Sequence, residues 1–148
     1  TTTGFDNLVT SSLSAVALAS ARVQMINFRG DQAERISVMP NRILIPPDLY
    51  DQAWEVINSP GKPDTANNNK NVHEGKYRIK KWNYLTDTND WSLHDSTMRK
   101  MMLHWVDRVK MEFAQAEDID TMVAKWRGYM RYALAHTDWR FLVGASVS

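Results

Sequence analysis

The feature that most constrains the fold is a strict alternation over residues 122–134. None of the seven even-numbered positions carries a charge, whereas three odd-numbered positions between them, Lys125, Arg127 and Arg131, are basic. Because successive side chains of a β-strand point to opposite faces, the alternation predicts a long, half-buried strand over 121–135. A helix can also be drawn through this segment, but a glycine in its middle disfavours one. The apolar side would consist of Met122, Trp126, Met130, Tyr132 and Leu134.

The rest of the chain predicts early helices and late antiparallel strands, an α+β fold. An alanine-rich helix begins near residue 13 and ends near 27–30, and a second helix begins at the Pro-Pro pair and ends near Asn58. On that second helix, Trp54 is predicted to lie in the core. The asparagine-rich segment 59–75 is expected to be an exposed, mobile loop. Strands are predicted at 36–38, 43–45, 76–85, 91–95, 139–144 and 103–113, the last broken near Asp107.

Composition excludes several functional classes. The 148 residues are 43% hydrophobic, enough for the core of one domain, and no apolar run reaches the roughly 18 residues that cross a bilayer. The chain has no cysteine, which excludes disulfides, zinc–thiolate sites and thiol catalysis. A net charge of +1 argues against a broad nucleic-acid-binding face.

An enzymatic function has little support. The pair His94-Asp95 is poorly arranged as a catalytic dyad, because neighbours on a strand face opposite ways. No metal-binding, nucleophile-elbow or phosphate-binding motif occurs, so we expect no catalytic residue, metal or cofactor. A small hydrolase using His94, Asp95, His104 or Asp107 is an alternative that depends only on the presence of those residue types.

A nucleic-acid-binding module is the stronger alternative. Residues 76–84 combine basic and aromatic side chains, the combination used by proteins that bind single strands. The same residues suit a solvated edge strand protected by lysines. Candidate contacts on this segment are Lys76, Arg78, Lys80, Lys81 and Trp82, to which Lys125, Arg127 and Arg131 can be added.

Large apolar side chains are abundant, with six tryptophans and eight methionines. They belong either to the core or to surfaces buried between subunits, and their number favours assembly. The candidate residues for these two environments are Trp54, Trp82, Trp126, Met130 and Trp139.

Several short motifs occur in a recognisable order. The most specific is 36–49, ISVMPNRILIPPDL, followed by Ala53, Val56 and the Asn58-Ser59 pair; a helix over 13–25 precedes it. The asparagine-rich loop 67–71, the strand 76–85, the segment WSLHD at 91–95 and a closing Asp138-Trp139-Arg140 follow. Over roughly residues 10–146 the chain resembles the major capsid proteins of tailed bacteriophages, with the fold named after phage Hong Kong ninety-seven, and within them the transposable-phage-like subfamily.

The resemblance implies a structural virion protein that forms pentamers and hexamers of an icosahedral shell around double-stranded DNA. No counterpart of the family's N-terminal arm, extended hairpin loop and spine helix is recognised, so the resemblance implies the C-terminal half. It divides the chain into a flexible lead-in segment (1–12), an axial-domain-like region (13–120) and closing strands of the peripheral domain (121–148). Implied partners are other copies and scaffolding or decoration proteins, with DNA as a non-specific neighbour and no membrane. The implied location is the capsid, with assembly in the host cytoplasm.

Overall fold

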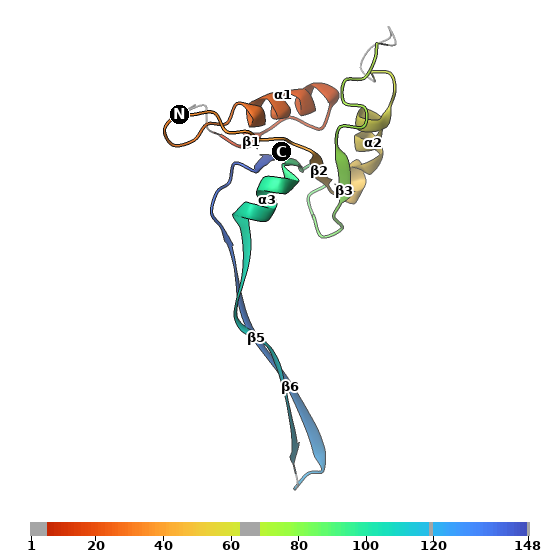
Figure 1. Ribbon diagram of the computed structural model, residues 1–148. Helices are drawn as coiled ribbons and strands as arrows, with labels where there is room; N and C mark the ends of the chain where they lie inside the picture. Colours follow the sequence, from red (N-terminus) through yellow and green to blue (C-terminus); the bar gives the residue numbers. More distant parts are fainter. Residues whose placement is uncertain (1–5, 63–68, 119, 148) are drawn as a thin grey trace.

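The molecule consists of a compact body and one long arm (Figure 1). The computed structural model describes residues 6–62, 69–118 and 120–147. The arm is an antiparallel pair, β5 (Leu103–Asp118) and β6 (Val123–His136), and the first and last described strands, near the two ends of the chain, lie in the body. At about 3.3 Å per residue the arm extends about 45 Å from the body.

The body is built on one five-stranded mixed sheet with the order β1-β7-β4-β2-β3. The central strand β4 is antiparallel to both of its neighbours, β7 and β2, while the outer strands β1 and β3 pair in parallel with β7 and β2. The sheet therefore combines strands that precede the arm in the sequence with β7, which follows it. The strands are β1 (Leu8–Val9), β2 (Arg42–Ile45), β3 (Arg78–Lys81), β4 (Trp91–His94) and β7 (Leu142–Ala145).

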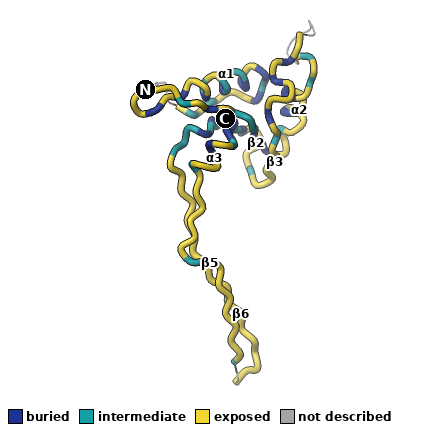
Figure 2. The backbone as a smooth tube through the Cα atoms, in the orientation of Figure 1, coloured by how far each residue is buried: buried dark blue, intermediate teal, exposed yellow. Residues whose placement is uncertain are grey.

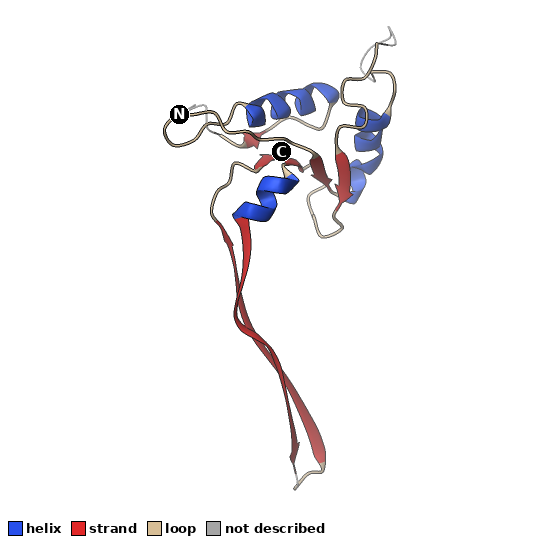
Figure 3. Ribbon diagram, viewed as in Figure 1, coloured by secondary structure: helices blue, strands red, loops and turns tan. Residues whose placement is uncertain are grey.

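Three α-helices in the described part of the chain complete the body; they are the blue ribbons in Figure 3. The Ser14 side chain caps the first helix by accepting a hydrogen bond from the Ala17 N–H, as expected for an N-cap serine. A short 3₁₀ turn, η1 (Pro47–Leu49), leads directly into the second helix. The helices are α1 (Ala15–Ile26), α2 (Tyr50–Asn58) and α3 (Ser96–Met102).

The core lies on one face of the sheet. Register places Ile43, Leu93 and Val143 side by side on the three central strands, and all three are fully buried. They belong to one cluster with buried side chains of α1, such as Leu18 and Met25, and of α2. The opposite face, which carries Arg42 and Leu44, is only partly covered.

Most predicted elements are confirmed, including the α+β class, both early helices and the break in the strand that starts at 103. The strand predicted at 36–38 is wrong: these residues form no strand. The helix α3 was not predicted, although Asp95 followed by serine and threonine is a capping signal. None of the helices in the described ranges is long and apolar enough to cross a membrane.

The segment 59–75 is only partly the exposed loop that was predicted. Its middle, 63–68, lies outside the described residues. Its flanks are held together by an isolated bridge between Gly61 and Lys70, and both Asn71 and His73 are buried. The Asn71 amide donates to the carbonyls of Val56 and Ser59, which attaches the loop to the end of α2.

Candidate assembly interface

The arm contributes nothing to the core of its own chain. No residue of 103–118 or 123–136 is buried, and the core cluster contains none of them (Figure 2). The strand predicted over 121–135 is therefore confirmed as a strand, but it is not half-buried within this chain. The alternating apolar residues of β6 thus form a surface that is exposed to solvent in the single chain.

Register sorts the arm into two chemically different faces. On β6, Trp126, Tyr132 and Leu134 lie on the same side of the strand. Two aromatic residues of β5 lie on that side as well: Trp105 is paired with Leu134, and Phe113 with Gly128. Trp126 and Phe113 are each 77% exposed. We call this side the aromatic face and define it by its large apolar side chains; Asp107 and Gln115, paired with Tyr132 and Trp126, lie on the same side. Those apolar side chains are Leu103, Trp105, Phe113, Trp126, Met130, Tyr132 and Leu134.

Within the aromatic face, side chains contact one another along the arm. The rings of Trp105 and Tyr132 stack with centroids 4.2 Å apart and planes 8° from parallel. Phe113 lies over Gly128: a Cβ on the glycine would be 3.5 Å from the phenyl ring. An aromatic ring that covers a cross-strand glycine compensates for the missing side chain. The glycine that weakened the helix prediction is thus accommodated in the strand.

The opposite side of the arm is charged. Lys125, Arg127 and Arg131 alternate with the aromatic residues, as the sequence pattern predicted. At the far end, the Lys125 ammonium pairs with the Asp118 carboxylate at 2.9 Å, and this hydrogen bond is the main cause that lowers the pKa of Asp118. Register shifts between Asp107 and Glu112 interrupt the pairing near the middle of the arm.

The described residues at the tip of the arm, 117–118 and 120–122, combine acidic side chains with one highly exposed apolar side chain. Glu117, Asp118 and Asp120 lie within six residues. Met122 is 90% exposed and has φ = 52°, in the left-handed region that favours glycine.

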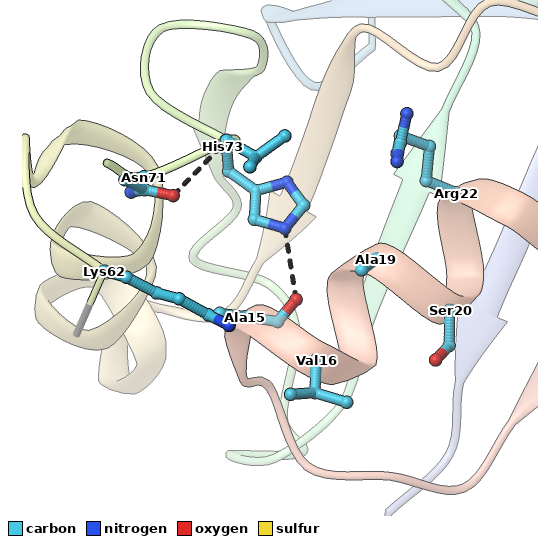
Figure 4. A pocket seen from close by; sticks show the side chains of 9 residues that line it. Ala15, Val16, Ala19, Ser20, Arg22, Lys62, Asn71 and His73 are labelled. Atoms are coloured by element: carbon cyan, nitrogen blue, oxygen red, sulfur yellow. Dashed lines mark hydrogen bonds between the residues drawn. The ribbon is translucent and has the colours of Figure 1, made fainter. Parts of the chain in front are cut away.

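A second feature is a cavity of about 320 Å³ beside α1, which we call the α1 pocket. Ala15, Val16 and Ala19 form its helical wall, and Lys62 and Arg22 lie at its two ends with His73 between them (Figure 4). The His73 Nε2–H donates to the Ala15 carbonyl oxygen at 3.1 Å. No carboxylate among the described residues lines this pocket.

Three buried polar atoms beside the α1 pocket have no hydrogen-bond partner in the part of the chain that the structure describes: Arg22 Nε, His73 Nδ1 and the Tyr77 hydroxyl. Burial lowers the pKa of His73; the hydrogen bond to Ala15 opposes this, while Arg22, Lys76 and Lys62 lower the pKa further. Burial likewise raises the pKa of Tyr77. The surroundings are cationic and favour an anionic group. Nothing in the sequence pattern indicated that residues from α1 and the 69–77 segment would meet here.

A third feature is a basic concavity of about 630 Å³ on the partly covered face of the sheet. Of the nucleic-acid contacts predicted from the sequence, it brings together Lys80, Lys81 and Trp82, and it adds Arg42 and Arg99. Arg78 pairs in register with Arg42, so it lies on the same sheet face. Lys76 is not part of this group, because it lines a cavity next to Arg22 and Tyr77.

The structure places the predicted tryptophan sites as follows. Trp54 is 51% exposed on α2, so the prediction that it lies in the core is wrong; Ala53, Val56 and Ile57 are the buried residues of that helix. Trp82 and Met130 are also exposed. Trp139 is partly buried and packs edge-on against Phe28, with ring centroids 5.2 Å apart.

His94 and Asp95 each hydrogen-bond to groups of the body. His94 Nε2 bonds to the Ser92 hydroxyl at 2.9 Å, and burial, aided by Arg99 and Arg42, lowers its pKa to about 4. The Asp95 carboxylate accepts backbone hydrogen bonds from Thr97 and Met98 and caps α3. No group of three or more potential metal ligands occurs in the described ranges.

Comparison with known families agrees with an exposed assembly surface. No curated protein matches the chain. A family model described as "Phage capsid protein" matches residues 1–145, nearly the whole sequence. The chain therefore belongs to this family of phage capsid proteins.

Proposed function

We propose that this chain is a major capsid subunit of the tailed-phage type and that its β5–β6 arm is the main contact between neighbouring subunits. As a member of the phage capsid family it is a structural protein of the virion shell. The observation that carries the proposal is the aromatic face, which extends along an arm that shares no core with its own body.

Stability arguments support a role for the arm in assembly. A single two-stranded ribbon is at best marginally stable in water, and three or more strands or a packed face are usually needed. Exposed apolar patches above a few hundred Å² mark interaction sites. Here Trp105, Phe113 and Trp126 are all more than half exposed on one face. Burial of that face against another copy would supply the missing packing.

The finer features are part of the same proposal. Pentamers and hexamers of an icosahedral shell around double-stranded DNA, scaffolding or decoration partners, and assembly in the host cytoplasm follow from the resemblance to tailed-phage capsids. The division into an axial-domain-like region (13–120) and peripheral closing strands (121–148) is likewise proposed. Its boundary falls in the turn of the arm, and β7 shares a sheet with β2 and β4.

Removal of the arm tests this function. His104 and Ala135 are paired across the arm, so replacing 105–134 by Asn-Gly closes the ribbon with a two-residue hairpin turn. Because the arm contributes nothing to the core, the shortened chain should fold with unchanged stability of the body. In native mass spectrometry we expect five- and six-subunit rings from the full chain and only monomers from the shortened one. A full chain without such rings, or rings that persist without the arm, would refute the proposal.

The basic concavity supports nucleic-acid binding as a second candidate function. Arg42, Lys80, Lys81 and Arg99 converge there, and Tyr84 beside them is 85% exposed. A binder that neutralises several phosphates loses affinity steeply as salt rises. Titration of a single-stranded oligonucleotide at several salt concentrations should therefore give a steep slope that Lys80→Glu reduces. A flat salt dependence would exclude this candidate.

A further inference from the structure

The position of Met122 indicates a function for its side chain. It lies at the extreme end of the arm with a left-handed backbone, a conformation that glycine adopts without steric cost and methionine does not. A large apolar side chain is thus kept, almost fully exposed, where glycine would be the easier choice. Strain of this kind is retained where the side chain has a role.

The acidic residues around Met122 define what the tip can bind. Glu117 and Asp120 are exposed, and the pairing with Lys125 keeps Asp118 ionised. A receptor for this tip therefore needs an apolar hollow with cationic groups at its edge.

The α1 pocket has these properties. Its wall is apolar, the cationic side chains of Arg22 and Lys62 lie at its ends, and the buried Arg22 Nε–H has no partner among the described residues. His73 is more than nine-tenths buried, and its Nδ1 has no hydrogen-bond partner among the described residues. The basic concavity fits less well, because Arg42, Lys80, Lys81 and Arg99 line it and would surround Met122 with charge.

We propose that the tip of the arm, formed by Glu117, Asp118 and 120–122, docks in the α1 pocket of a second copy of this chain. Met122 fills the apolar cavity, and the flanking carboxylates pair with Arg22 and Lys62. The tip and α1 lie at opposite ends of the molecule (Figure 1), so a chain does not fill its own pocket. The contact is head-to-tail, which closes into rings when the rotation permits. The inference rests on the proposed function and names the partner surface of the arm.

A pair of substitutions at Met122 separates docking from turn formation. Met122→Gly relieves the backbone strain and should leave folding intact or improved, yet it should weaken self-association by about tenfold or more in sedimentation velocity. Met122→Leu keeps the apolar bulk and should change association by less than about threefold. Unchanged association of Met122→Gly would overturn the proposal.

A charge exchange identifies the pocket. Asp120→Lys and Lys62→Glu each place like charges together and should each reduce association by about tenfold or more. A mixture of the two variants should associate again, because the tip of each variant meets an α1 pocket of opposite charge on the other variant. Circular dichroism and urea denaturation of each variant confirm that the fold is retained.

Other outcomes of these experiments distinguish a wrong docking site from a wrong proposed function. If Asp120→Lys and Lys80→Glu weaken association while Lys62→Glu does not, the tip binds the basic concavity and the α1 pocket is excluded. If rings form but none of these charge changes matters, the proposed function stands and this docking site is wrong. If the full chain forms no rings at all, the proposed function fails as well.

Discussion

The Asp95 carboxylate accepts a 2.8 Å hydrogen bond from the backbone N–H of Met39, a residue 56 positions away. Its other oxygen caps α3, and α3 continues without a break into β5. One buried side chain therefore connects the extended segment before β2 with the base of the arm.

Replacement of Asp95 should destabilise the body. Asp95→Ala removes the helix cap and the part-buried hydrogen bond that the carboxylate accepts from the Met39 N–H, a combined cost of about 2–4 kcal/mol. Urea denaturation followed by circular dichroism measures it. Asp87, which accepts similar backbone hydrogen bonds in an exposed turn, is the matched control. Asp87→Ala should cost less than about 1 kcal/mol, and equal losses for the two variants would contradict the assigned role of Asp95.

Stability should depend on pH through His94. Its folded pKa of about 4 lies below the ordinary value of 6.5, so the unfolded chain binds the proton first as pH falls. The stability contributed by neutral His94 is complete above about pH 6.5 and is lost as pH falls towards 4, a total of about 3 kcal/mol. His94→Gln should flatten this part of the profile of unfolding free energy against pH.

The two sides of α2 should respond differently to truncation. Ile57 is 1% exposed, and Ile57→Ala should cost about 2–5 kcal/mol because it leaves a cavity. Trp54 is half exposed, so Trp54→Ala should cost less than about 1 kcal/mol. Thermal denaturation of the monomeric, arm-shortened chain isolates these effects from assembly. A larger loss for Trp54 than for Ile57 would contradict the orientation of the helix.

The aromatic face should govern association more than the charged face does. Trp126→Lys places a charge on a surface that assembly buries and should weaken self-association by about tenfold or more. Lys125→Ala removes only an exposed ion pair with Asp118, which typically contributes less than about 1 kcal/mol. Light scattering over a range of protein concentrations compares the two. Equal effects would indicate that the aromatic face remains solvated in the assembly.

The sequence predicts local elements of this chain better than it predicts which surfaces are covered. Alternation over 122–134 identifies β6 correctly, because the period of two is a property of the strand itself. The same pattern cannot tell whether the apolar side meets its own core or another chain, so the burial was predicted wrongly. Trp54 is a second example. This apolar side chain was predicted to lie on the buried side of its helix, whereas it lies outside that side and is half exposed.

The α1 pocket could not be predicted because its members are far apart along the chain. Ala15 and His73 are joined by a hydrogen bond across 58 residues, and no local pattern reports such a contact. The basic concavity was partly predictable. Lys80, Lys81 and Trp82 are neighbours in sequence, whereas Arg42 and Arg99 come from β2 and α3 and join them only in the folded sheet.

The independence of the arm from the core has a consequence for how such a protein can change. Two residues inserted in each strand would add about 7 Å of reach and keep every side chain on its present side. A single residue inserted in each strand would instead move every side chain beyond the insertion to the opposite face of the arm. The spacing between neighbours can thus be adjusted in steps of residue pairs, while the body around Ile43, Leu93 and Val143 keeps its packing.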